Sequence, residues 1–172
     1  MASYATVETA LARLHDANPE VQRGAFRGRL KHFQRLGLPL GERPGKGSRI
    51  NYDAQQIWQL AFALELSECG IDPTKIAQII RELWKDFISV RVDEAIERFG
   101  SRDELVEFYV SFMSEAWTGK GVYLEAVSAE AYKDRIRPYS REKRRIITVN
   151  LRRMVEELTK HLSDLGENIT EE

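Results

Sequence analysis

The stretch from Asp53 to Trp84 constrains the fold most, because it predicts two consecutive helices joined by a tight turn. Asp53 and Gln56 have the spacing of a capping box, which begins a helix. Gly70 can end that helix, and Asp72 followed by Pro73 can begin the next one. Apolar side chains recur at helical spacing in both: Ile57, Leu60, Ala61 and Leu64, then Ile76, Ile79, Ile80, Leu83 and Trp84. This stretch predicts a mainly helical fold.

Two further helices are predicted upstream. The first runs over 6–15, where Val7, Ala10, Leu11 and Leu14 form one apolar stripe. The second begins at Asn18 as N-cap with Pro19 at the first helical position, and it continues to about Leu36. Its inward face carries Phe26, Leu30 and Phe33. Gly37 and Pro39 end it.

The C-terminal half predicts a mixture of helix and strand. Ser101 and Glu104 form a second capping-box pattern before a helix carrying Leu105, Phe108, Tyr109, Phe112 and Ala116. The segments 122–127 and 144–151 are strand candidates that can pair with each other. A last helix follows Asn150, with a seam of apolar residues at spacings of 4, 3, 4 and 3: Leu151, Val155, Leu158, Leu162 and Leu165. We expect this seam to join two protomers, and the alternative is a single amphipathic helix packed on its own domain.

Charge is strongly segregated along the 172-residue chain, although its net charge is only -1. Between residues 22 and 52, eight basic residues face a single acid, Glu42. Between residues 133 and 153, nine basic residues face two acids. Such segregation creates strong local fields that the total charge conceals. The segment 137–145 is either a second phosphate-contacting region or a solvated linker.

The second helix carries its cations on one ridge. Arg23, Arg27, Lys31 and Arg35 are four residues apart, so each is rotated by only about 40° from the last. A helix of this diameter fits the major groove of DNA, where Arg and Lys donate to guanine or phosphate. Gly24 and Gly28 lie beside the ridge, and glycine is disfavoured within a helix by up to about 1 kcal/mol. Close approach of a neighbour or of nucleic acid would explain them, whereas a merely solvated cationic face is the competing interpretation.

Three segments together resemble the winged helix-turn-helix of the MerR transcription-regulator family. "RLKHFQRLGLP" resembles the end of the family's recognition helix, with Leu30 to Leu38 matching in order. Gly47, Arg49 and Tyr52 in "GKGSRINYDAQQIWQL" approximate the residues that close the wing. "ELSECGIDPTKIAQII" resembles the following helix pair. The resemblance covers about residues 6–84, and no long dimerisation helix directly follows Trp84 as it does in the family.

The resemblance and the residues together predict a winged helix-turn-helix DNA-binding domain over 1–90 and a C-terminal helical or α+β dimerisation or regulatory domain over 91–172. Arg27, Lys31 and Arg35 are expected in or beside the major groove, with Arg23 and Arg29 on phosphates. His32 belongs to the same DNA-binding set. The wing is expected to hold the DNA backbone through five residues: Arg43, Lys46, Ser48, Arg49 and Tyr52.

These features predict a sequence-specific, double-stranded DNA-binding transcriptional regulator that forms a homodimer, with RNA polymerase as a further candidate partner. We expect it in the cytoplasm, associated with the nucleoid through DNA, and outside the membrane. An architectural or recombination accessory factor of the excisionase or prophage type is one alternative. A protein-interaction module using the basic face is the other. The scattered His residues and the single Cys69 give no catalytic or metal-binding pattern, so neither an enzyme nor a cofactor is expected.

Overall fold

The computed structural model describes residues 1–18, 21–41, 50–97, 109–113, 125–127 and 146–169, and it is mainly helical. The N-terminal part contains β1 (Ala2–Ser3), α1 (Tyr4–Leu14), α2 (Arg23–Arg35), β2 (Asn51–Tyr52), α3 (Ala54–Glu68) and α4 (Pro73–Leu83). It continues through the π-helical turn η1 (Trp84–Ile88) into α5 (Ser89–Glu97). The C-terminal part contains β3 (Tyr109–Met113), β4 (Glu125–Val127), β5 (Ile146–Asn150) and α7 (Leu151–Ser163).

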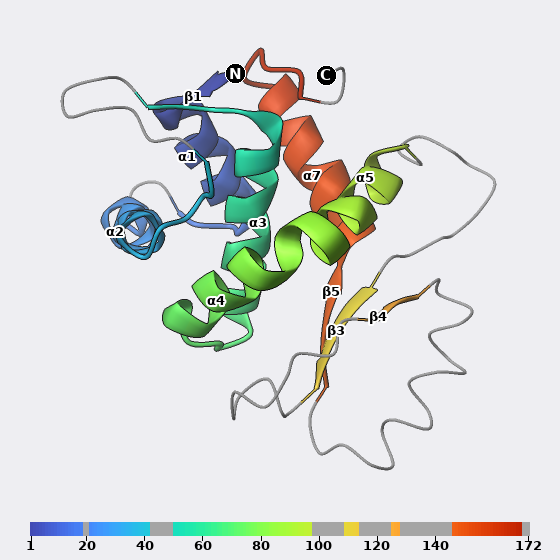
Figure 1. The fold of residues 1–172 in the computed structure, drawn as a ribbon. Helices are drawn as coiled ribbons and strands as arrows, with labels where there is room; N and C mark the ends of the chain where they lie inside the picture. The colour runs from blue at the N-terminus through green and yellow to red at the C-terminus, as the bar shows by residue number, and fades with distance from the viewer. Residues whose placement is uncertain (19–20, 42–49, 98–108, 114–124, 128–145, 170–172) are drawn as a thin grey trace.

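Helix α3 is the centre of the core. Its residues from Ile57 to Leu64 are all buried, so other parts of the chain cover this stretch on every side. Figure 1 shows α3 in the middle of the helical part, with α1 on one side of it and α7 on the other. A fully buried Leu or Ile side chain contributes about 1.5–3 kcal/mol, and this makes α3 the element on which the others are assembled.

The predicted helix boundaries around α3 and α4 are confirmed. Asp53 accepts a hydrogen bond from the amide of Gln56, and Gln56 accepts one from the amide of Asp53, which completes the capping box. Asp72 caps α4 through the amides of Thr74 and Lys75. Gly70 takes a left-handed conformation with φ of 77° and ends the turn after α3. These local signals set where both helices begin and where α3 ends.

Helix α2 begins later than predicted. Its N-cap is Gln22 rather than Asn18, and no side chain caps the first turn. The backbone amide of Asn18 instead donates a hydrogen bond to Oε1 of Gln22. The predicted end is confirmed: Gly37 has φ of 95°, and the amide of Leu38 donates to the carbonyl of Phe33, as in a Schellman motif.

The helical chain does not end at Trp84. It passes through η1, where the hydrogen-bond spacing widens for one turn, and continues as α5 to Glu97. The buried residues Trp84, Ile88, Val92 and Ala95 keep this continuous stretch attached to the core. The helix that follows η1, α5, has nine residues.

The middle of the C-terminal half differs from the prediction. Residues 109–113, predicted as part of a helix, form strand β3. The two predicted strands are confirmed in β4 and β5, but they do not pair with each other, because β3 lies between them in the order β4-β3-β5. Both pairings are antiparallel, with Val110 opposite Ala126 on one side and Val149 on the other. The predicted capping box at 101–104 lies outside the described residues.

The predicted dimerisation seam is wrong, because α7 packs within its own chain. Leu151, Val155, Leu158 and Leu162 are each 0% exposed, and Leu165 is partly buried against the same core. The helix packs against α1 and α5, which corresponds to the alternative of a single amphipathic helix packed on its own domain. Helix α7 shares one hydrophobic core with α1, which lies on the other side of the division predicted at residue 90. That division into two domains stays a prediction.

Candidate nucleic-acid interface

Helix α2 presents two different faces. Phe26, Leu30 and Phe33 are buried and hold it against the core, as predicted. Figure 1 shows α2 at the outer edge of the helical part, beside α1 and away from α7. The face opposite the buried one is therefore exposed along the length of the helix.

The exposed face of α2 has two glycines, which place no side chain on it. A Cβ atom placed on Gly24 or on Gly28 would meet no atom within 4 Å, so both positions border open space in the described part of the chain. Neither glycine has a positive φ, and neither makes room for a neighbouring element. Internal packing therefore does not explain why glycine stands here, despite its cost of about 1 kcal/mol in a helix interior.

Three predicted DNA-binding residues lie exposed on α2. Lys31, His32 and Arg35 are solvent-exposed, and among the described residues none of them forms an ion pair. Lys31 and Arg35 continue the row that begins with Gly24 and Gly28, because the spacings of four, three and four residues keep one helical face. The structure thus brings open space and unneutralised positive charge onto the same side of α2.

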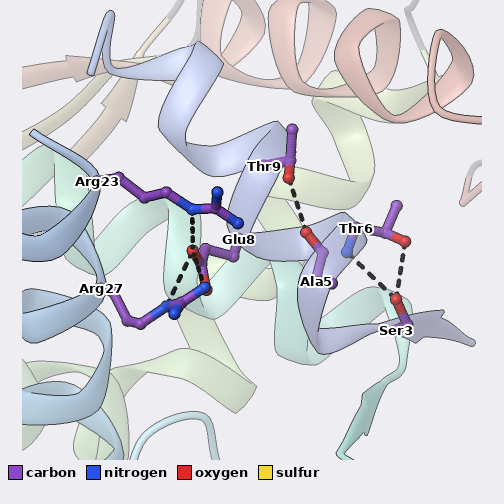
Figure 2. A network of polar contacts seen from close by, with 7 residues as sticks. All are labelled: Ser3, Ala5, Thr6, Glu8, Thr9, Arg23 and Arg27. Atoms are coloured by element: carbon purple, nitrogen blue, oxygen red, sulfur yellow. Dashed lines mark hydrogen bonds and ion pairs between the residues drawn. The ribbon is translucent and has the colours of Figure 1, made fainter. Parts of the chain in front are cut away.

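Arg23 and Arg27 have an internal partner, Glu8 of α1 (Figure 2). The Glu8 side chain is only 7% exposed. Its carboxylate oxygens accept three hydrogen bonds from Arg27 at 2.9–3.1 Å. Arg23 is held more weakly, with its Nε 3.7 Å from Oε1 and its side chain 68% exposed. Two of the four cations of the ridge predicted from the sequence therefore share one carboxylate, which offsets one of the four positive charges.

Arg29 also has an acidic partner. Its Nη2 donates to Oε1 of Glu68 at the end of α3, and its guanidinium lies 5.9 Å from the ring centre of Phe26. Both side chains of the pair remain partly exposed, so solvent screens their attraction. Arg29 joins α2 to α3, and its assignment to a phosphate contact remains a prediction.

The predicted wing residues Arg43, Lys46, Ser48 and Arg49 lie outside the described residues, but the chain on either side of them is anchored. On the first side, the amide of Leu40 donates to Oε1 of Gln59 at 2.6 Å, and its carbonyl accepts from Nε2 of Gln56 at 3.1 Å. On the other side, Ile50 accepts a hydrogen bond from the amide of Tyr4, and β2 pairs with β1. Both ends are thus fixed to the helical core.

Tyr52 does not lie at the surface where the prediction put it. It is 4% exposed, and its hydroxyl accepts a 2.6 Å hydrogen bond from Nε2 of Gln34. Its ring lies 6.3 Å from that of Tyr4, whose pKa is raised to about 12 by burial and by the nearby negative charge of Glu8. Tyr52 joins β2 to α1 and α2, and we therefore leave it out of the proposed interface.

Two residues of this region escaped the sequence analysis. Glu8 was not predicted, because nothing in the sequence links it to Arg27, nineteen residues away. The one local sign is its position beside the apolar residue Val7. Arg81 of α4 was the second: its Nη2 donates to the carbonyl of Leu36 at the end of α2. A cation at a helix C-terminus is favourable, so Arg81 stabilises the end of α2.

The remaining chemistry of the described residues does not suggest a competing site. They include no group of three or more His, Cys, Asp or Glu side chains arranged to hold a metal ion. None of the helices in the described ranges is long and apolar enough to cross a membrane. No protein-family model, curated protein or solved structure matches the chain. The resemblance to the MerR family therefore rests on the sequence motifs alone.

Proposed function

We propose that this protein is a sequence-specific, double-stranded DNA-binding transcriptional regulator that uses α2 as its recognition helix. The observation that carries the proposal is the outward face of α2, where Gly24 and Gly28 border open space and Lys31 and Arg35 are exposed without an acidic partner in the described part of the chain. A helix face that carries cations and has no side chains at two positions can enter a groove lined by phosphates.

The way α2 is held supports this function. Phe26, Leu30 and Phe33 fix its inner side, while Arg81 stabilises its C-terminal end. Contacts to DNA require a rigid element, because side chains that reach base edges must keep a defined position. Leu40 and Ile50, which precede and follow the basic 42–49 segment in the chain, are anchored to α3 and to Tyr4.

An architectural or recombination accessory function would use the same surface. The two functions differ in what happens to the DNA: a regulator discriminates between sequences, whereas an architectural factor derives much of its effect from bending. Ligation of short DNA circles in the presence of the protein separates them. We propose regulation first because the cations of α2 lie on a face that fits the major groove, where each base pair is distinguishable.

Lys31 and Lys160 offer a matched test of the surface. Both are exposed lysines on helices, but Lys160 lies on α7, away from α2. In fluorescence-anisotropy titrations with a random-sequence duplex, Lys31→Gln should weaken binding severalfold and reduce the salt dependence by about one phosphate contact. Lys160→Gln should bind as the unaltered protein does. Equal behaviour of the two variants would exclude α2 as the interface.

A further inference from the structure

Arg27 differs from the other cations of α2 in how firmly its guanidinium is held. The Glu8 carboxylate accepts bonds from both Nε and Nη2, and this carboxylate is almost fully buried (Figure 2). If Arg27 left, only the 3.7 Å contact with Arg23 would compensate the buried charge of Glu8, which is strongly unfavourable. Arg27 therefore cannot swing away from α1 toward a phosphate as a long, free side chain could.

The bonds to Glu8 leave part of the guanidinium available. Arginine has five N–H donors in a planar fork. The side-on pair with Glu8 uses the N–H of Nε and one N–H of Nη2. Both N–H groups of Nη1 and the second of Nη2 stay free of Glu8, and 43% of the side chain is exposed. The unused outer edge still has the two parallel donors that bidentate contact with guanine O6 and N7 requires.

The neighbouring glycines compensate for the short reach of a fixed arginine. Arg27 is tied back toward α1, so a base edge can meet it only if α2 approaches the DNA closely. Gly24 and Gly28 are the residues three before and one after it, and both border open space. Larger side chains at these positions would hold the groove away from Arg27. The fixed position of Arg27 and the absence of side chains at Gly24 and Gly28 therefore both fit a close approach of α2 to the groove.

We propose that Arg27 is a pre-oriented guanine reader in the major groove and that Glu8 is its positioning residue. This inference rests on the proposed function, since it assigns sequence discrimination to one residue of the same surface. Arg23, which is mostly exposed and has only a 3.7 Å contact with Glu8, can leave for a phosphate. Glu8 therefore gives the two arginines different roles: Arg27 distinguishes between bases, and Arg23 only attracts phosphate.

The test begins with selection of a preferred duplex from a random library by the full-length protein. Each guanine of that duplex is then replaced in turn by 7-deazaguanine, which lacks the N7 acceptor. For the unaltered protein, one replacement in the site should weaken binding about tenfold. Arg27→Lys keeps the charge but loses the fork, so it should respond less to that one replacement than the unaltered protein does, while its response at other guanines stays the same.

Glu8→Gln and Glu68→Gln complete the test, because each removes one negative charge that faces an arginine of α2. Glu8→Gln should lower the ratio of affinities for the selected and random duplexes about tenfold, because Arg27 loses its orientation. Glu68→Gln should leave that ratio unchanged. Thermal melting of each variant shows whether it is folded, and Arg27→Lys tests the guanine contact even if Glu8→Gln does not fold.

The possible failures are distinguishable. A selected site without guanine, or an identical 7-deazaguanine profile for Arg27→Lys and the unaltered protein, would overturn the assignment of Arg27 and leave the DNA-binding function intact. No detectable binding of the unaltered protein to any duplex at 50 mM salt would instead overturn the proposed function itself, since phosphate contacts are strongest at low salt.

Discussion

Gln59 holds the backbone of Leu40: its Oε1 lies 2.6 Å from the Leu40 amide nitrogen, and the residue is 4% exposed. Gln56, one turn earlier on α3, donates to the carbonyl of the same residue. Two side chains of the central helix thus satisfy both backbone groups at the point where the chain leaves α2 for the basic 42–49 segment. A polar side chain is retained inside the core for this purpose.

Replacing Gln59 should therefore destabilise the protein. Gln59→Leu keeps the size of the side chain but leaves the Leu40 amide without its acceptor, and a buried unsatisfied donor costs about 1–3 kcal/mol. Urea denaturation at neutral pH measures this loss. Gln78→Leu is the control, because Gln78 is exposed on α4 and should change stability by less than about 0.5 kcal/mol. Equal effects of the two substitutions would contradict the anchoring role.

Leu158 tests the packing of α7. It is 0% exposed within a single chain, so Leu158→Ala should lower the free energy of unfolding by about 2–5 kcal/mol. Because the seam is internal, the melting temperature of the unaltered protein should not change over a hundredfold range of protein concentration. A melting temperature that rises with concentration would support a dimer that stabilises the fold, contrary to this packing.

Gly28 should show opposite effects on stability and on DNA binding. A Cβ atom there meets nothing, so Gly28→Ala should stabilise the folded protein by about 0.5–1 kcal/mol. Gly28→Gln adds a side chain that would stand between α2 and a groove, and it should weaken DNA binding at least severalfold while the protein stays folded. Unchanged DNA affinity of Gly28→Gln would show that α2 does not approach DNA on this face.

Gly37 provides a contrasting substitution at the end of the same helix. Its φ of 95° is disfavoured for other residues, and an added Cβ would lie 3.1 Å from Nη2 of Arg81. Gly37→Ala should therefore destabilise the protein by about 1–2 kcal/mol, in contrast to Gly28→Ala. Chemical denaturation of the two variants side by side distinguishes a glycine that the backbone needs from one that the fold does not.

His15 should make stability depend on pH. Burial lowers its pKa from 6.5 to about 4 in the folded protein, so the unfolded chain binds a proton more readily between these values. The stabilising contribution of the neutral imidazole is complete above pH 6.5 and is lost as the pH falls toward 4, by an amount on the order of 1–3 kcal/mol. Denaturation of the unaltered protein and of His15→Leu at pH 7 and pH 4.5 measures it: the unaltered protein should lose more stability. Parallel losses would contradict this assignment.

The features that were predicted correctly from the sequence are those decided by short-range interactions. Asp53 with Gln56, Asp72 with Pro73, and Gly37 each act within one helical turn, so their roles follow from spacing alone. The inward face of α2 was equally predictable, because periodic apolar residues need a core to cover them.

The predictions that were wrong concerned contacts between residues distant in the sequence. The spacing of Tyr109 and Phe112 is compatible with a helix, but residues 109–113 pair with strands on both sides, and a short apolar run does not distinguish these outcomes. The seam around Leu158 has the same spacing whether it covers a second copy or its own domain. The pairing of Glu8 with Arg27 required the packing of α1 on α2, which charge counting along the chain does not provide.

The salt dependence of DNA binding tests the central claim most directly. Anisotropy titrations of the full-length protein with a random-sequence duplex, from about 50 to 200 mM salt, count phosphate contacts through a log–log slope near -0.9 for each. Exposed Lys31 and Arg35, with Arg23 released from its weak contact, predict measurable affinity at 50 mM and a fall in affinity that corresponds to at least three contacts. Undetectable binding at 50 mM, or an affinity that does not change with salt, would contradict the account.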